Sequence, residues 1–430
     1  MTDEHPSPSA ATADVASGRI ATPTTPPERS GREVARAIAL AAGGAGCFML
    51  VHTATFPTLP IYLSLRGASD ADIALIIGMI GIVSIAFRPL TGWLIDAWGR
   101  RQMMATALLS VAGVAAGYGF AAQLFQLGLF RAVQGMNVGV MNAAVTTYVS
   151  DIAPGRRRAE FLGYLNAVQT TATSIGPTLG FAILLWSAPN PMSSLAFWWP
   201  DLAAFGGYNF AALFLFLLLT AAVGALLTLL APAPPRHGGW QPLRWHRLVY
   251  RKALAPMLLM VGLTVPFASV LTYLPFSAPS KGLSNVGLYF TCQALGALAA
   301  GLTLGRLADR LGRRPVVTAG MIGASAGMGL LAVAPNAAVL LLAGVLSGFS
   351  QAGARNGIAA WTADQAPAHE RGAALSTSSM GFDIGVSAGS FVLAAIVPAF
   401  GITAGWYAAA SVPLVGALVA GAVLEDRRPR

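Results

Sequence analysis

The sequence predicts an all-α membrane protein whose twelve transmembrane helices form two six-helix repeats. Three observations support this prediction: an apolar composition, apolar runs of membrane-spanning length, and two near-identical blocks half a chain apart. Of the 430 residues, 55% are hydrophobic and 10% are charged, and the mean hydropathy is +0.63. Soluble domains carry about 25% charged residues. The chain therefore lacks the polar surface of a water-soluble fold.

Apolar runs of about 20 residues, long enough to cross a bilayer as a helix, recur along the chain. Pro, Gly and charged residues mark the breaks between them. The expected spans are 37–63, 73–95, 102–122, 125–149, 161–186, 203–231, 253–276, 285–307, 315–334, 337–360, 372–397 and 401–424. The expected organisation is a disordered cytoplasmic tail (1–35), a first bundle (36–231), a cytoplasmic linker (232–252), a second bundle (253–424) and a cytoplasmic tail (425–430).

The net charge of +10 comes from basic residues clustered in alternate connections between the apolar runs. This positive-inside asymmetry predicts that both termini are cytoplasmic. No basic face or aromatic groove is present, so nucleic-acid binding is not expected. The cysteines, Cys47 and Cys292, lie alone in apolar runs, so neither a disulfide nor a metal site is expected. Arginine far outnumbers lysine, which favours a bacterial source and hence a bacterial plasma (inner) membrane.

The block "GWLIDAWGRR" begins at Gly92, and the block "GRLADRLGRR" begins at Gly305, so their numbering differs by 213 (305 − 92). An even number of spans in each repeat keeps both copies in one orientation, and many secondary transporters are built this way, with the substrate site between the repeats. A D-x-x-P-x-x-x-R motif recurs at the same offset, as Asp151, Pro154 and Arg158 and then as Asp364, Pro367 and Arg371. We therefore interpret the chain as a tandem duplication.

These motifs resemble those of the major facilitator superfamily, and the resemblance covers essentially everything after residue 35. Its signature, G-x-L-x-D-x-x-G-R-R, joins the second and third helices on the cytoplasmic side. The resemblance implies a conformational latch, in which glycines allow close packing and a sharp turn while the carboxylate meets basic groups or a helix N-terminus. The alternative is a loop that only fixes orientation. The implied latch residues are Gly92, Asp96, Gly99, Arg100, Arg101, Gly305, Asp309, Arg313, Asp151, Arg158, Asp364 and Arg371.

The stretch "ATSIGPTLG" resembles the fifth-helix signature of the superfamily's antiporters, G-x-x-x-G-P-x-x-G. Ala172 replaces the first glycine, whereas Gly176, Pro177 and Gly180 match. Pro177 bends the helix and the glycines permit tight packing. The resemblance implies a hinge and seal that favours exchange over leak, and hence export. The alternative is that Gly and Pro are simply common in membrane helices.

The stretch "FPTLPIY" resembles the first-helix P-x-x-P-x-Y motif of drug:proton antiporters, in which Pro57 and Pro60 shape the outer end of the helix. Some members carry an acid in this helix, whereas this chain has His52. Histidine titrates near pH 6.5 and suits a proton carrier. An equal alternative is a neutral histidine bonded to a neighbouring helix.

Asp383, in "MGFDIGVSAG", is the one carboxylate well inside a predicted span. An ionised carboxylate is costly in a membrane, which favours a proton carrier at this position. The alternatives are a contact with a substrate cation, or a structural ion pair with Arg355 or His52. Arg131, in "FRAVQGMNVG", resembles the fourth-helix R-x-x-Q-G arginine that the family links to proton coupling. Its alternative is a structural bond to helix-end carbonyls.

Arg355 lies deep in its span and is a candidate for the substrate cavity, together with Gln169, Asn142 and Gln293. These amides are also typical of helix–helix contacts. Arg88 is expected to extend to the cytoplasmic interface.

The resulting prediction is a secondary active transporter that couples proton entry to efflux of a small amphiphilic molecule, a drug-like compound or secondary metabolite, as in multidrug resistance. The alternatives are an uptake symporter for a sugar or organic acid, and a metallophore exporter. No P-loop, G-x-S-x-G motif or metal-ligand spacing is present, so neither an enzyme nor a cofactor is expected. The expected partners are the substrate, protons and lipid, and the family default is a monomer.

Overall fold

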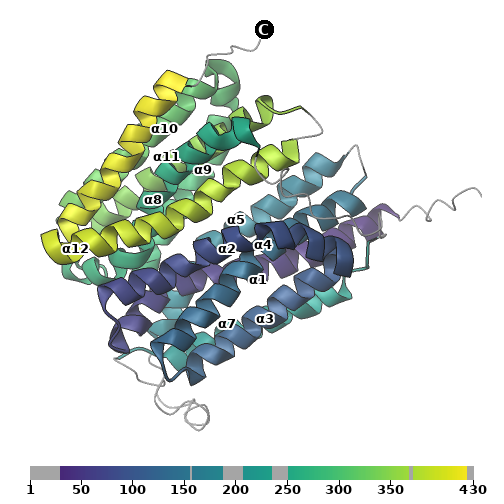
Figure 1. The fold of residues 1–430 in the computed structure, drawn as a ribbon, viewed down its shortest axis with the longest axis horizontal. Coiled ribbons are helices and arrows are strands. Elements are labelled where there is room, and N and C mark those ends of the chain that lie inside the picture. The colour runs from purple at the N-terminus through teal and green to yellow at the C-terminus, as the bar shows by residue number, and fades with distance from the viewer. Residues whose placement is uncertain (1–29, 155–156, 187–206, 235–249, 368–370, 424–430) are drawn as a thin grey trace, which may run out of the picture.

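The computed structural model describes residues 30–154, 157–186, 207–234, 250–367 and 371–423 (Figure 1). In these residues the chain forms two bundles of long helices that lie side by side. The first contains α1 (Gly31–Leu65), α2 (Asp70–Trp98), α3 (Arg100–Phe120), α4 (Leu124–Ile152), α5 (Arg158–Leu184) and α7 (Phe210–Leu230). The second contains α8 (Leu254–Ser277), α9 (Gly287–Leu311), α10 (Arg313–Val333), α11 (Ala337–Asp364) and α12 (Arg371–Val423).

The helix α12 supplies two membrane spans. It has 53 residues, and its helical geometry is broken at Gly401, where φ is 80°. This break lies where the sequence predicts the boundary between the last two spans. By length and hydropathy, nine of the described helices can cross a membrane. The more polar α4 and α5 are similarly long, with 29 and 27 residues, and the two spans of α12 bring the total to the predicted twelve.

The second bundle repeats the first in the same register. Adding 213 to the bounds of α3 gives the bounds of α10, Arg313–Val333. The glycines before these helices, Gly99 and Gly312, have φ values of 94° and 90°. Residues other than glycine rarely adopt this backbone conformation. The duplicated block therefore folds twice into the same sharp turn. We call the end of the bundles with these turns the turn end, and the opposite end the far end.

The first helix begins earlier than expected. Ser30 accepts a hydrogen bond from the Glu33 amide, and the Glu33 carboxylate accepts one from the Ser30 amide, which forms a capping box. Such a cap satisfies amides that have no partner within the helix. The helix therefore starts at Gly31, inside the segment expected to be a tail.

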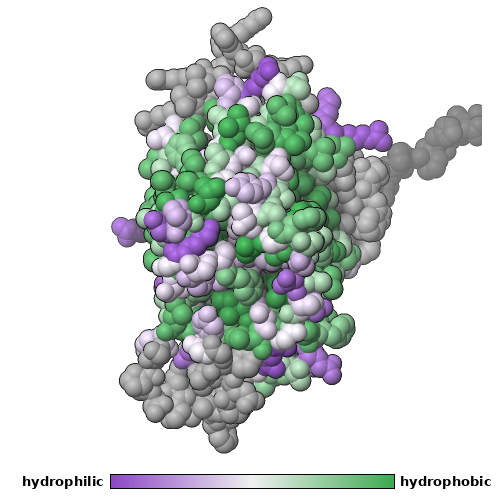
Figure 2. All heavy atoms as spheres, turned by 90° about the vertical axis from the view of Figure 1, so that its left-hand side faces the viewer, coloured by the Kyte–Doolittle hydropathy of each residue, from purple (hydrophilic) through white to green (hydrophobic). Residues whose placement is uncertain are grey.

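Large apolar side chains cover much of the outer surface. Phe125, Leu302 and Leu418 are each more than 70% exposed. Figure 2 shows one such face, which is mostly hydrophobic with a few hydrophilic patches. Lipid tails cover a surface of this kind without loss of hydrogen bonds. Together with the long helices, it makes the chain a multi-pass membrane protein.

The two bundles touch mainly through three helix pairs: α2 with α12, α5 with α9, and α1 with α8. Near the far end, the Thr178 hydroxyl donates a 2.7 Å hydrogen bond to the carbonyl of Gly287 and contacts Thr291. Gly78 of α2 packs on Phe391 of α12 in the same way, and a Cβ on Gly78 would lie 3.1 Å from the Phe391 ring. The repeat offset relates the two contacts, because Phe391 is the equivalent of Thr178 and Thr291 is the equivalent of Gly78. A pseudo-twofold axis therefore relates the bundles.

Candidate functional site

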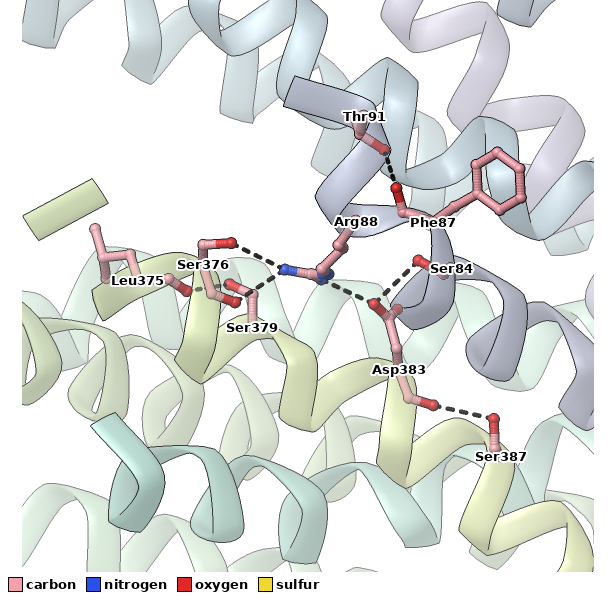
Figure 3. A network of polar contacts seen from close by, with 9 residues as sticks. All are labelled: Ser84, Phe87, Arg88, Thr91, Leu375, Ser376, Ser379, Asp383 and Ser387. Atoms are coloured by element: carbon pink, nitrogen blue, oxygen red, sulfur yellow. Dashed lines mark hydrogen bonds and ion pairs between the residues drawn. The ribbon is translucent and has the colours of Figure 1, made fainter. Parts of the chain in front are cut away.

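An ion pair joins the two halves inside the membrane-spanning region. Arg88 Nη2 on α2 lies 2.8 Å from Asp383 Oδ2 on α12 (Figure 3). Ser84 donates a 3.1 Å hydrogen bond to the same oxygen, and Arg88 Nη1 donates one of 2.8 Å to the Ser376 carbonyl. The partner of Asp383 is thus Arg88 rather than Arg355 or His52. The Arg88 guanidinium turns toward the other half, where it meets both Asp383 and Ser376.

The helices that carry this pair approach very closely. A Cβ on Gly81 would overlap the Asp383 carbonyl and the Ser387 hydroxyl, and that hydroxyl donates a 2.7 Å hydrogen bond to the Gly78 carbonyl. The side chains of Arg88 and Asp383 are 24% and 11% exposed. Partial burial strengthens their attraction, and each loses a stabilising partner if the other is removed.

Sequence reasoning missed Ser84 as a site residue, and it named Arg88 without its contact with Asp383. They lie four residues apart, so they share one face of α2. This spacing was visible in the sequence, but it does not show that α12 covers that face.

Arg131 lies in a second polar cluster, within the first half. It is fully buried, and its Nη1 donates hydrogen bonds to Gln134 (2.8 Å) and Thr55 (3.2 Å). Its guanidinium also lies over the Phe56 ring, 5.5 Å from the centroid. The expected alternative of helix-end carbonyls is not observed, since the described partners are side chains.

His52 is close to the Arg131 cluster. It is buried, stacks on Phe48 and meets the edge of Phe56, with ring centroids 6.1 and 4.6 Å apart. Phe56 therefore links His52 to Arg131, whereas Asp383 is bonded to α2. The residues predicted for proton coupling fall into two separate groups.

The antiporter-like glycines pack α5 against α1. A Cβ on Gly176 would overlap the Thr53 hydroxyl, and one on Gly180 would lie 2.9 Å from the Ala54 carbonyl. Pro177 lies between them inside α5, and α1 carries Pro57 and Pro60. The close packing predicted at these glycines is therefore present, and their role as a hinge and seal stays a prediction.

The predicted latch contains two equivalent ion pairs. Arg100 Nε lies 3.0 Å from Asp151 Oδ2, and Arg313 Nε lies 3.5 Å from Asp364 Oδ2. Both residues of the second pair follow their counterparts by 213 positions. In each half, the pair ties the start of one helix (α3 or α10) to the end of the next (α4 or α11).

The other predicted latch residues lie in different surroundings. Arg101 Nη1 donates a 3.2 Å hydrogen bond to the Ala231 carbonyl at the end of α7. Arg158 is exposed, and its neighbour Arg157 pairs with Glu160 instead, at 2.8 Å. The expectation of a close helix contact at Gly92 is wrong, since a Cβ there would meet nothing within 4 Å. The side chains of Asp96, Asp309 and Arg371, and the surroundings of Gly305, lie outside the described residues.

Of the predicted cavity residues, two lie in contact. Gln169 on α5 donates a 3.4 Å hydrogen bond to the Asn142 side chain on α4. Arg355 on α11 is exposed. Gln293 is buried, and Gly348 of α11 packs directly on its backbone at the contact of α9 with α11.

Comparison with known proteins agrees with this architecture. The family model of the Major Facilitator Superfamily matches residues 41–288 and 280–430. The quinolone resistance protein NorA of Staphylococcus aureus is 28% identical over 128 residues, which are 29% of this chain and 32% of NorA. The MFS-type efflux transporter ffsH of Aspergillus flavipes is 37% identical over 108 residues, which are 24% of this chain and 19% of ffsH. The chain thus matches about a third or less of the length of these relatives.

Solved structures share the fold over nearly the whole chain. A bacterial homologue of the human lysosomal transporter Spinster has a TM-score of 0.72 at 13% identity, covering 92% of this chain and 96% of that one. A D-xylose–proton symporter has a TM-score of 0.72 at 15% identity, covering 91% and 98%. Identities this low show the fold alone. The duplicated turn, the two related bundles and the family model matching both halves lead to one conclusion: the chain belongs to the major facilitator superfamily of membrane transporters.

Proposed function

We propose that the protein is a proton-coupled exporter of small amphiphilic molecules, in which Asp383 carries the proton and Arg88 is its counter-charge. The observation that carries this proposal is the ion pair between the two halves. A transporter with alternating access must reopen contacts between its halves in each cycle. A proton on Asp383 removes one charge of the pair and weakens one of those contacts.

The arrangement of the halves supports an inward-facing stage for this structure. Thr178 with Gly287, and Gly78 with Phe391, close the far end, and no larger contact between the halves links α4 or α11 to the opposite bundle among the described helices. The basic connections favour a cytoplasmic turn end in a bacterial inner membrane. The two halves are then apart at the cytoplasmic end while Asp383 is paired with Arg88.

The proposed cycle follows from this stage. Substrate enters from the cytoplasm, and the halves rock so that the turn end closes and the far end opens. A proton from outside then neutralises Asp383 and frees Arg88. The halves return, the proton leaves to the more alkaline cytoplasm, and the pair re-forms. In this last state Ser84 and Arg88 both donate hydrogen bonds to the Asp383 side chain.

The direction of transport rests on sequence similarity. A quinolone resistance protein and an MFS-type efflux transporter match parts of the chain, and Gly176, Pro177 and Gly180 resemble the antiporter signature. Drug-like compounds or secondary metabolites are the proposed substrates, with the protein acting as a monomer.

Reconstituted vesicles with an imposed pH gradient test the proposal, with norfloxacin, a quinolone, as the probe. We expect norfloxacin to move against the direction of proton entry, and a pH-sensitive dye inside the vesicles to record proton movement that depends on norfloxacin. Asp383→Asn should abolish this proton movement but leave downhill norfloxacin exchange. His52→Gln should retain the norfloxacin-dependent proton movement. Norfloxacin flux that does not depend on the pH gradient in the unaltered protein would refute proton coupling.

A second candidate is uptake of an organic acid together with a proton. One observation favours it: protonation of Asp383 leaves the Arg88 guanidinium free to bind the carboxylate of a substrate. The proton and substrate would then move in the same direction in the vesicle assay, which separates this candidate from efflux.

A further inference from the structure

Arg355 is a cation deep within a membrane-spanning helix, and it is exposed. It precedes the last residue of α11, Asp364, by nine positions (364 − 355), or about 14 Å along the helix axis. Arg88 lies about 15 Å from the turn end of α2 by the same measure. A guanidinium at such depth is costly against lipid and normally faces a bundle interior or a water-filled cavity.

The exposed residues of α11 lie on two different faces. Leu342 is 58% exposed and precedes Arg355 by thirteen positions (355 − 342), which places it about 220° away around the helix at roughly 100° per residue. The first half repeats this arrangement, because Leu129 is 53% exposed and precedes the exposed Asn142 by the same number of positions (142 − 129). Leu342 and Leu129 suit lipid, whereas the polar side chains of Arg355 and Asn142 suit water.

Arg355 and Asn142 occupy equivalent positions in the two halves, since their numbers differ by the repeat offset (355 − 142 = 213). Asn142 is bonded to Gln169 of α5. The helices α4 and α11 pack mainly against helices of their own halves, so their polar faces are left to the space between the bundles. The pseudo-twofold axis then places Asn142, Gln169 and Arg355 at similar depth along this space, which we call the cavity.

The described residues give this cavity an excess of positive charge. Arg88 and Asp383 neutralise each other at 2.8 Å, and Arg131 is enclosed within the first half. Among the described residues, no carboxylate forms an ion pair with Arg355. The charge of Arg355 is therefore available to a molecule that enters the cavity.

We propose that the transported molecule carries an anionic group, such as a carboxylate, sulfonate or phosphate, and that Arg355 binds it. A guanidinium presents paired N–H donors that match such groups and stays charged at any working pH. The inference rests on the proposed function only in taking the chain to be a transporter with an accessible cavity. The inference depends neither on the direction of transport nor on the source of energy.

Charged thiol reagents measure the sign of the potential in the cavity. The host is the full chain with Cys47→Ala and Cys292→Ala, reconstituted in phosphatidylcholine vesicles, which hold no anionic lipid. Asn142→Cys supplies the reporter, and Ser280→Cys, exposed in the short 3-10 helix after α8 (Pro279–Lys281), supplies a control outside the cavity. Each is labelled with the anionic sulfonatoethyl and the cationic trimethylammonioethyl methanethiosulfonate. At each cysteine, the labelling rate of the anionic reagent is divided by the labelling rate of the cationic reagent. The ratio at residue 142 is then divided by the ratio at residue 280.

We expect the anionic reagent to be favoured at residue 142, and Arg355→Gln to lower the normalised ratio on the order of tenfold. Arg355→Lys should preserve most of the ratio, because it keeps the charge. A ratio that is unchanged by Arg355→Gln, or a preference for the cationic reagent with Arg355 present, would overturn the proposal. These rates require no transport, so failure of proton-coupled efflux leaves the result interpretable.

Discussion

Arg88 on α2 and Asp383 on α12 form a 2.8 Å ion pair across the boundary between the two halves. Among the described residues, the side-chain partners of each charge come from the other half. The relative position of the halves and the protonation of one carboxylate are therefore linked. A change in either one shifts the other, as linkage requires.

Removing one partner of this pair should be more harmful than removing both. Arg88→Gln leaves the Asp383 carboxylate unpaired, and Asp383→Asn leaves the guanidinium unpaired, at an expected cost of about 3 kcal/mol each. The double variant has neither unpaired charge and should melt above both single variants in detergent. If it melts below both, the two side chains do not act as a pair.

The duplicated latch pairs should differ in strength. Arg100 and Asp151 are 3.0 Å apart and largely buried, whereas Arg313 and Asp364 are 3.5 Å apart and Asp364 is 59% exposed. A double-mutant cycle on the first pair should give a coupling energy of about 1 kcal/mol or more, and the second should give less. Asp151→Asn should also slow transport more than Asp364→Asn. Equal coupling in both cycles would contradict this ranking.

A side chain at either glycine turn should lower the stability of the fold. Gly99→Ala and Gly312→Ala place an L-residue at φ near 90°, which we expect to destabilise the fold by about 1–2 kcal/mol. Gly92→Ala is the matched control in the same block, because a Cβ there meets nothing within 4 Å. Thermal melting of purified variants should show losses for the first two only.

Glu160 should not contribute to the pH dependence of transport. It lies exposed at the start of α5, where hydrogen bonds from Arg157 lower its pKa from 4.5 to about 2. A lowered carboxyl pKa gives a stabilising effect that is present above the ordinary pKa and is lost only as the pH falls toward 2. Between about pH 5 and 8 the group stays ionised, so Glu160→Gln should leave the pH profile of transport unchanged. A shifted profile would contradict this assignment.

The sequence alone predicts the repeat well because identical local chemistry produces identical local structure. Gly99 and Gly312 require the same turn, and the charged ends of the flanking helices then meet in both halves. The partner of Asp383 was not predictable in this way. Arg88 lies 295 residues away, and only the packing of α12 on α2 brings the two together.

The cavity residues show the same limit. Gln293 and Arg355 are both polar residues within apolar runs, and the sequence does not say which way each one faces. In the structure, Gln293 lies under α11 whereas Arg355 is exposed. The direction of a side chain around a helix follows from its neighbours rather than from its own identity.

The central claim is that protonation of Asp383 releases the inward-facing arrangement. Spin labels at Ser150→Cys and Ala363→Cys, in the last turns of α4 and α11, report the distance between the halves at the turn end, with Cys47 and Cys292 replaced by alanine. Double electron–electron resonance in lipid vesicles needs no substrate. We predict that lowering the pH increases a population with a shorter distance, and that Asp383→Asn shows this population at every pH. A distribution that is independent of pH, or a pH response that survives in Asp383→Asn, would contradict the account.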